Sequence, residues 1–366
     1  MGKWKDCCLG EIITLQRGFD LPRTKAKGGK YPVVGSNGII GYHDCYTTEA
    51  PSITIGRSGN VGKPFIYFGK TWAHNTTLFI KEFKQVDPVF TYYLLKTLNL
   101  SNYAGGSAVP TLNRNHLYSL PVYIPSQIND QQRIANFLHL LDDKIELNNQ
   151  INGNLQQLAF ELFGKLMSAS QESKCQLNSI AILNPKRTLP RNKSARCIEM
   201  SKLSTSCSFP AGWVYKAYNG GATFKNGDTL MARITPCLEN GKAGFINFLD
   251  EIEIAFGSTE YIVISTKGDI PPEFFYCLVR SPKFIDYAKK NMNGSSGRQR
   301  VSAEVIGKYE LPALTTEMLS EFNTIVPSLF KKIRDNSVEN MKLAQMRDCL
   351  LPKLMSGELD VSDIDL

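Results

Sequence analysis

The sequence predicts an α+β protein: two similar α/β lobes separated by two long antiparallel helices, which form a coiled coil with pseudo-twofold symmetry. Three observations predict this fold. The chain contains an internal repeat, two segments have apolar residues at helical spacing, and the rest has short apolar runs between turn signals. We therefore expect a first lobe at 1–128, a helix at 129–168, a second lobe at 169–313, a helix at 314–358 and a tail at 359–366.

The internal repeat is clearest in the helical segments, where Lys165–Ser168 recurs as Lys353–Ser356 at an offset of 188 residues. In the lobes the match is weaker and the offset drifts, as between Ile53–Arg57 and Thr229–Arg233. Conserved spacing in one part with drifting loops in the other is typical of two copies of one fold whose surfaces have diverged.

The helical segments have a narrow apolar stripe with a period near 3.5, which favours a coiled-coil seam. The alternative is two helices that face separate cores. The residues expected to form the seam and fix its register are Ile145, Asn148, Leu155, Leu162, Ile333, Asn336, Leu343 and Leu350. A buried Asn in such a seam penalises slipped registers, because slipping leaves its amide without a partner. We therefore expect Asn148 and Asn336 to fix the register.

The length of the first helix predicts a spacing function. From Gln131 to Met167 the helix would rise roughly 54 Å at ~1.5 Å per residue. Helices of that length would hold the two lobes apart by about the same distance.

The lobes are rich in turn signals, such as Ser36-Asn37-Gly38 and Asn226-Gly227-Asp228, which separate short predicted strands. Helical patches are expected at Pro88–Thr97 and Pro272–Tyr287. Both lobes are basic, with net charges of +7 over 1–128 and +6 over 169–313, whereas 129–168 carries −2 and 314–366, the second helix with the tail, carries −3. This distribution favours a polyanion that meets the lobes. The alternative is ordinary solvated surface.

No catalytic motif stands out in the chain. The sequence contains no GxxxxGK[ST] phosphate loop, no GxGxxG, no HExxH and no GxSxG. Nine cysteines without a CxxC pair and four scattered histidines argue against a zinc site or a disulfide framework. We expect no catalytic residue, no metal and no cofactor in this chain.

The lobes instead offer side chains suited to nucleic acids on loops next to strands. Glycines let backbone N–H groups approach a phosphate, and Arg and Gln suit guanine and adenine edges. Exposed turn residues without a function are the alternative at each position. The DNA-binding candidates are Arg57, Lys63, Asn75, Thr76, Ser107, Asn113, Arg114, Arg233, Lys242, Thr259, Arg298, Gln299 and Arg300.

This layout resembles the DNA specificity subunit of type I restriction-modification enzymes. The resemblance is carried by Trp4–Glu11, by the helical runs Asp130–Ala135 and Leu140–Ile145, and by the terminal Leu350–Leu359. The second helix departs from the pattern, because Thr316-Glu317-Met318-Leu319 stands where a Glu-Gln-Gln-Arg-like start is usual.

The resemblance implies two target-recognition domains that each read one half of a bipartite double-stranded DNA site, with the helices setting the spacer between the halves. A length of roughly 54 Å corresponds to about 16 base pairs at ~3.4 Å each, so the lobes would contact half-sites with untouched bases between them. The resemblance also implies assembly with two methyltransferase (modification) subunits, docked by the helices, and with motor-nuclease (restriction) subunits. The cofactors S-adenosylmethionine, ATP and magnesium would belong to those partners. Two alternatives from other classes are an autonomous DNA-modifying or DNA-cleaving enzyme and a coiled-coil scaffold that binds protein.

The expected location is the cytoplasm, without membrane attachment. No run approaches the 18 apolar residues that a spanning helix needs, and Met1–Asp6 includes no apolar stretch typical of a signal peptide.

Overall fold

The computed structural model describes residues 3–26, 28–106, 110–168, 173–295 and 297–360. The chain divides into two compact units, Met1–Lys144 with Leu343–Leu366, and Ile145–Lys342. Two long helices, α4 (Ile128–Ser168) and α9 (Thr316–Met355), each contribute one part to each unit. Each unit combines one lobe with parts of both helices. This division into units does not test the expected five segments, which stay a prediction.

The first lobe is built on an antiparallel sheet with strand order β2-β8-β5-β6. The central strand β5 is buried along its whole length. Helix α2 (Pro88–Thr97) packs on this core and begins where Asp87 accepts a hydrogen bond from the Phe90 backbone N–H at 2.8 Å, with Pro at the first helical position. The strands are β2 (Ile13–Arg17), β5 (Ser52–Gly56), β6 (Pro64–Tyr67) and β8 (Thr77–Phe83).

A second, smaller sheet of the first lobe has the order β4-β3-β7. Strands β3 (Tyr31–Gly35) and β4 (Gly38–His43) form a hairpin through the predicted turn at Ser36-Asn37-Gly38, whereas β7 (Trp72–Ala73) pairs with β3 in parallel. Gly38 has φ +100, a conformation that favours glycine.

The second lobe repeats both sheets. Its antiparallel sheet has the order β13-β20-β17-β18, and its second sheet has the order β15-β14-β19-β16 with β14 and β19 again parallel. The strands are β13 (Ala181–Leu183), β14 (Ser194–Ile198), β15 (Val214–Ala217), β16 (Ala222–Phe224), β17 (Thr229–Ala232), β18 (Ala243–Phe245), β19 (Ala255–Gly257) and β20 (Tyr261–Thr266).

The repeat extends to the strands that precede each long helix. In the first lobe β1 (Trp4–Cys8) pairs with β11 (Pro121–Pro125), and in the second β12 (Lys174–Gln176) pairs with β21 (Glu310–Pro312), both antiparallel. One-turn helices follow, α1 (Leu9–Ile12) and α5 (Leu177–Ile180). The backbone N–H of Leu9 donates to Leu120 and that of Leu177 to Tyr309, at 2.9 Å in both lobes.

The remaining elements cover the sheets or connect the strands. In the second lobe the expected helical patch Pro272–Tyr287 is two helices, because the chain breaks at Ser281 and Pro282 starts a new helix. These elements are η1 (Arg23–Lys25), η2 (Leu100–Tyr103), β9 (Ala104–Gly105), β10 (Thr111–Leu112), α3 (Arg114–Tyr118), η3 (Met200–Lys202), α6 (Glu273–Arg280), α7 (Pro282–Lys290) and α8 (Ala303–Gly307).

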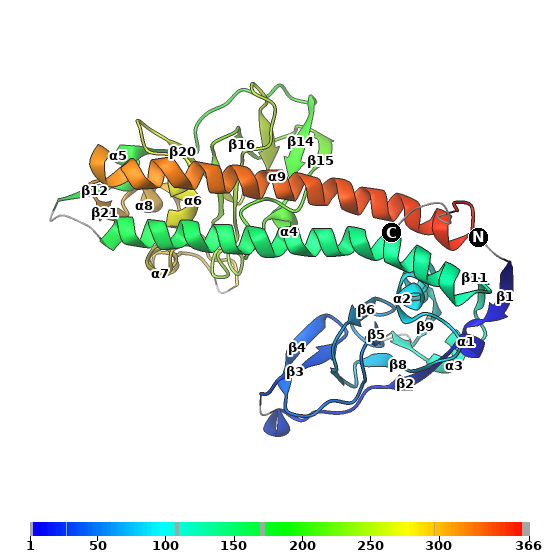
Figure 1. The fold of residues 1–366 in the computed structure, drawn as a ribbon. Coiled ribbons are helices and arrows are strands. Elements are labelled where there is room, and N and C mark those ends of the chain that lie inside the picture. The colour runs from blue at the N-terminus through cyan, green and yellow to red at the C-terminus, as the bar shows by residue number, and fades with distance from the viewer. Residues whose placement is uncertain (1–2, 27, 107–109, 169–172, 296, 361–366) are drawn as a thin grey trace. The chain divides into compact units, whose positions relative to one another are not determined.

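The two long helices pack against each other in antiparallel fashion and also against the lobes (Figure 1). In the second unit, Lys165 pairs with Glu321 and Asn148 with Asn340, so α4 and α9 run in opposite directions. Ala159 and Phe163 of α4 share a hydrophobic core with Phe322 of α9 and the α6 helix. The helices therefore combine the two arrangements that the sequence left open, a common seam and burial in the core of a lobe.

The first unit uses the other ends of the same helices. Ile134 and Leu138 of α4 lie in one core with Leu351 and Leu354 of α9 and with Leu9 of the lobe. In the part of the chain that the structure describes, no helix is long and apolar enough to cross a membrane.

Candidate nucleic-acid interface

The loops after β5 and β17 are held by the same backbone hydrogen bonds in the two lobes. The N–H of Arg57 donates to the Thr76 carbonyl at 2.8 Å, and the N–H of Leu112 donates to the Arg57 carbonyl at 2.9 Å. These bonds bring together three loops that are distant in sequence. The Gly56 position accepts no side chain, because a Cβ there would lie 1.9 Å from the Asn60 carbonyl oxygen.

The second lobe repeats this arrangement at matched positions. The N–H of Arg233 donates to the Glu260 carbonyl at 3.0 Å, and the N–H of Val301 donates to the Arg233 carbonyl at 3.0 Å. Lys63 and Lys242 are also matched, since their carbonyls accept from the residues before Arg57 and Arg233 at 2.9 and 3.0 Å. The structure thus places both arginines at one topological position, beside the strand-to-loop segments that contain Asn75 and Thr76 or Thr259.

The side chains around Arg57 form a polar network. The Arg57 Nη1 donates to the Asn75 carbonyl at 3.4 Å, and the Asn75 amide donates to the carboxylate of Asp20. The Thr76 hydroxyl lies 3.1 Å from Nδ1 of His74. Burial, together with the nearby charge of Arg17, lowers the pKa of the Arg57 guanidinium, and burial lowers the pKa of His74.

In the second lobe, the carboxylate of Glu260 joins two of the predicted arginines. It accepts from Nε of Arg300 at 3.0 Å and from Nη2 at 2.7 Å, and it lies 3.3 Å from Nε of Arg233. The Arg300 donors hold the pKa of Glu260 below its usual range. Beside this cluster is a hollow of about 310 Å³ lined by residues that include Arg233, Thr259 and Tyr261.

The other predicted residues have mixed surroundings. Asn113 caps α3 by accepting from the Asn115 N–H at 3.0 Å, and Arg114 donates to the Leu15 carbonyl at 3.4 Å. The Lys242 ammonium donates to the Met200 carbonyl at 3.1 Å, whereas Lys63 and Arg298 are exposed. The Gln299 carbonyl accepts from the Thr235 N–H at 3.1 Å. Ser107 lies outside the described residues.

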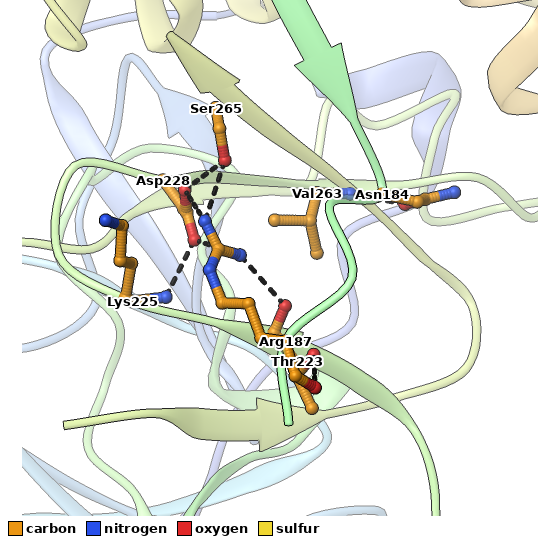
Figure 2. Close-up of polar contacts among 7 residues, drawn as sticks. All are labelled: Asn184, Arg187, Thr223, Lys225, Asp228, Val263 and Ser265. Carbon is orange, nitrogen blue, oxygen red and sulfur yellow. Dashed lines mark hydrogen bonds and ion pairs between the residues drawn. The ribbon is translucent and has the colours of Figure 1, made fainter. Parts of the chain in front are cut away.

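A buried ion pair that the sequence did not single out supports the second lobe (Figure 2). Arg187, in the loop after β13, lies 2.8 Å from Asp228, whose side chain is 2% exposed. Asp228 also accepts from the hydroxyl of Ser265 on β20 and from the Lys225 N–H at 2.7 Å. Burial raises the pKa of Asp228, and these donors oppose that shift. The cluster fixes the turn from which β17 leads to Arg233.

Neighbouring residues fasten the same loop to the sheet. Asn184 has a left-handed backbone with φ 47, donates its N–H to the Val263 carbonyl at 2.8 Å and accepts from the Val263 N–H at 2.9 Å. Figure 2 shows this pair beside the Arg187–Asp228 cluster. Arg187 and Asp228 are 41 positions apart in the sequence, and Asn184 belongs to no motif. The cluster therefore becomes visible only in the folded chain.

The predicted seam residues lie in both units. Asn148 and Asn336 are 1% and 2% exposed, and Ile333 is also buried. Asn148 donates to the Oδ1 of Asn340 and Asn336 to that of Asn152, both at 2.9 Å. Ile145, Leu155, Leu162, Leu343 and Leu350 are half-buried.

One group of possible metal ligands occurs among the described residues. Ligand atoms of His43, Asp44 and Cys45 lie within 4.8 Å of one another at the end of β4. All nine cysteines are free. The expectation that the chain holds no metal stays a prediction.

Two copies of one lobe with matched basic loops, joined by two long helices, define a duplicated α+β protein. Residues 1–157 match the family model described as the type I restriction modification DNA specificity domain. This part of the chain therefore contains the DNA specificity domain, and the chain as a whole is similar to the DNA specificity subunits of type I restriction-modification systems.

Two relatives and one solved structure are similar to most of the chain. The chain is 23% identical to the type I restriction enzyme HindI specificity subunit of Haemophilus influenzae, over 74% of this chain and 77% of the relative. It is 26% identical to the type I restriction enzyme MjaIX specificity subunit of Methanocaldococcus jannaschii, over 75% of this chain and 70% of the relative. The crystal structure of the S subunit from M. genitalium covers 96% of both chains with a TM-score of 0.64 at 18% identity, which shows a shared fold.

Proposed function

We propose that this chain is the non-catalytic subunit that selects the DNA sequence for a type I restriction-modification complex. Each lobe reads one half of a bipartite double-stranded site. The observation that carries the proposal is the repeated set of backbone hydrogen bonds that places Arg57 and Arg233 at one topological position in two basic lobes. One recognition unit is therefore present twice, with different side chains around it.

The chemistry of these loops suits two kinds of DNA contact. Exposed lysines and arginines neutralise phosphates and position the protein, and Arg, Gln and Asn side chains can discriminate base edges. Because the side chains differ between the lobes, the half-sites differ too, and the combined site is asymmetric.

The long helices set the spacer between half-sites and dock two methyltransferase subunits. Helix α4 has 41 residues, which corresponds to about 62 Å. Within each unit, α4 and α9 share a hydrophobic core, which supports a role of the helices in spacing. Methyl transfer and cleavage belong to the methyltransferase and motor-nuclease partners, which hold S-adenosylmethionine, ATP and magnesium.

The test is methylome sequencing of the host with and without this chain. Loss of a single bipartite methylated motif supports the proposal, and an unchanged methylome contradicts it. A purified chain that by itself methylates or cuts DNA in the presence of magnesium and labelled S-adenosylmethionine would indicate an autonomous enzyme. A chain whose complexes show no salt-dependent DNA binding would indicate a protein-binding scaffold.

A further inference from the structure

The guanidinium of Arg300 is held in a fixed orientation at the surface of the second lobe. Its Nε lies 3.0 Å from both carboxylate oxygens of Glu260, and its Nη2 lies 2.7 Å from Oε1. Its Nη1 donates to the Arg298 carbonyl at 3.1 Å. The Arg300 side chain is nevertheless 38% exposed, so a ligand can reach it.

The carboxylate occupies one edge of the guanidinium and leaves donors at the other. A guanidinium has five N–H groups in a planar fork. Among the described residues, these contacts use the Nε group and one group on each terminal nitrogen. One N–H therefore remains on Nη1 and one on Nη2, the two atoms that together can form a bidentate pair.

A held arginine with two terminal donors fits a guanine. Its O6 and N7 are adjacent acceptors in the major groove, and a bidentate arginine is the most frequent specific contact to them. Holding the fork beforehand reduces the conformational entropy that is lost when the contact forms.

The first lobe differs at this position. Thr76 stands where the second lobe has Glu260, and its backbone carbonyl makes the matching bond to Arg57. Within the described part of the chain, the Arg57 side chain donates to a backbone carbonyl, that of Asn75 at 3.4 Å, and not to a carboxylate. The carboxylate-held arginine is thus a feature of the second lobe.

We propose that Arg300, with Glu260 as its positioning residue, reads a guanine in the half-site that the second lobe contacts. The inference rests on the proposed function and adds the base and the two residues that select it. Glu260 acts through the arginines that it holds and not on DNA directly, since a carboxylate next to DNA repels phosphates.

The experiment uses the full-length chain assembled with its methyltransferase subunits. Selection from a pool of random-sequence duplexes first defines the bound motif. Duplexes in which each base pair of that motif is replaced in turn then give relative affinities by competition. For the wild-type chain, we expect replacement of one guanine to reduce affinity about 5- to 150-fold.

Two variants test the roles separately. Arg300→Gln should abolish the preference for guanine at that position and leave the other half-site unchanged. Glu260→Gln should reduce the same preference while raising affinity for unrelated DNA, because a negative charge is removed. If Glu260 only stabilised the fold, Glu260→Gln would lower both the preference for guanine and the affinity for unrelated DNA. Glu304→Gln is the matched control: it removes one carboxylate from an exposed ion pair with Lys308 in the same lobe and should leave base preference unchanged.

The outcomes distinguish this inference from the proposed function. If Arg300→Gln weakens binding to all duplexes equally, Arg300 contacts a phosphate, and the inference fails while the proposed function stands. If the wild-type complex selects no bipartite motif, both fail.

Discussion

Asn336 donates a hydrogen bond from its side-chain amide to the Oδ1 of Asn152 at 2.9 Å, across the contact between α9 and α4. Asn148 and Asn340 make the matching bond at the same distance, at positions related by the 188-residue repeat. The four asparagines are therefore two equivalent pairs within the second unit. In each pair, one asparagine is a predicted seam residue, Asn148 or Asn336. Its partner, Asn340 or Asn152, lies one helical turn from the equivalent seam residue on the other helix.

This pairing determines what a single substitution does. Asn336→Leu leaves the buried Oδ1 of Asn152 without its donor and should lower the free energy of unfolding by about 1–3 kcal/mol. Adding Asn152→Leu should recover much of that loss, because neither amide then remains unpaired. Thermal unfolding of the wild type, both single variants and the double variant gives the coupling between the two residues. Additive effects would contradict the pairing.

The Arg187–Asp228 cluster makes a second prediction about stability. Arg187→Met leaves a carboxylate buried without its charge partner, which should cost about 3–5 kcal/mol. Differential scanning calorimetry should show a large fall in the Tm of the transition that includes the second lobe. Lys216→Met, which breaks an exposed ion pair with Glu199 in the same lobe, should leave that Tm nearly unchanged.

Gly56 offers a test of the loop that places Arg57. A methyl group at position 56 would overlap the Asn60 carbonyl, so Gly56→Ala must displace the loop after β5. We expect weaker sequence-specific DNA binding with little change in affinity for unrelated DNA, measured by mobility shift. Gly69→Ala is the control, since nothing lies within 4 Å of the added carbon. If Gly56→Ala and Gly69→Ala changed sequence-specific binding equally, the loop after β5 would have no special role in DNA recognition.

His74 predicts a pH dependence of stability. Burial lowers the pKa of His74 below its usual 6.5, and the charge of Asp20 opposes this shift only in part. Below pH 6.5 the unfolded chain binds the proton more readily than the folded chain, so stability should fall as the pH decreases. The difference in Tm between pH 7.5 and pH 5.5 should be smaller in His74→Gln than in the wild type. An identical difference would show that other groups dominate.

The proposed spacer function predicts a response to helix length. Four residues inserted after Lys144 and four after Lys342 lengthen both helices by about 6 Å, or one to two base pairs. These positions lie between the Asp142–Arg347 and Asn148–Asn340 contacts, so both contacts can be kept. Methylome sequencing should show a longer spacer with unchanged half-sites. An unchanged spacer would contradict the proposed role of the helices.

Much of the fold could be predicted because its signals are local. Asp87-Pro88 marks the start of α2, and the helical spacing of apolar residues predicts α4 and α9. Helical spacing does not show which apolar residues are buried, since Leu158 and Met346 are 42% and 50% exposed.

The second sheets could not be predicted, because their signals are not local. All four residues of β15 are exposed, so no alternation marks the strand, and the parallel pair β3–β7 joins residues about 40 positions apart. The candidate site shows the same limit. Arg300 was singled out from its residue type, but Glu260, which holds it, becomes visible only when residues 40 apart meet.

The first unit is completed by residues from the end of the chain. Leu351, Leu354 and Met355 lie in the same core as Leu9 and Ile134. During synthesis, the first lobe therefore leaves the ribosome well before the helix that completes its core. Until α9 has been made, that lobe exposes the apolar surface that α9 will cover, and a premature stop codon within α9 would damage both units.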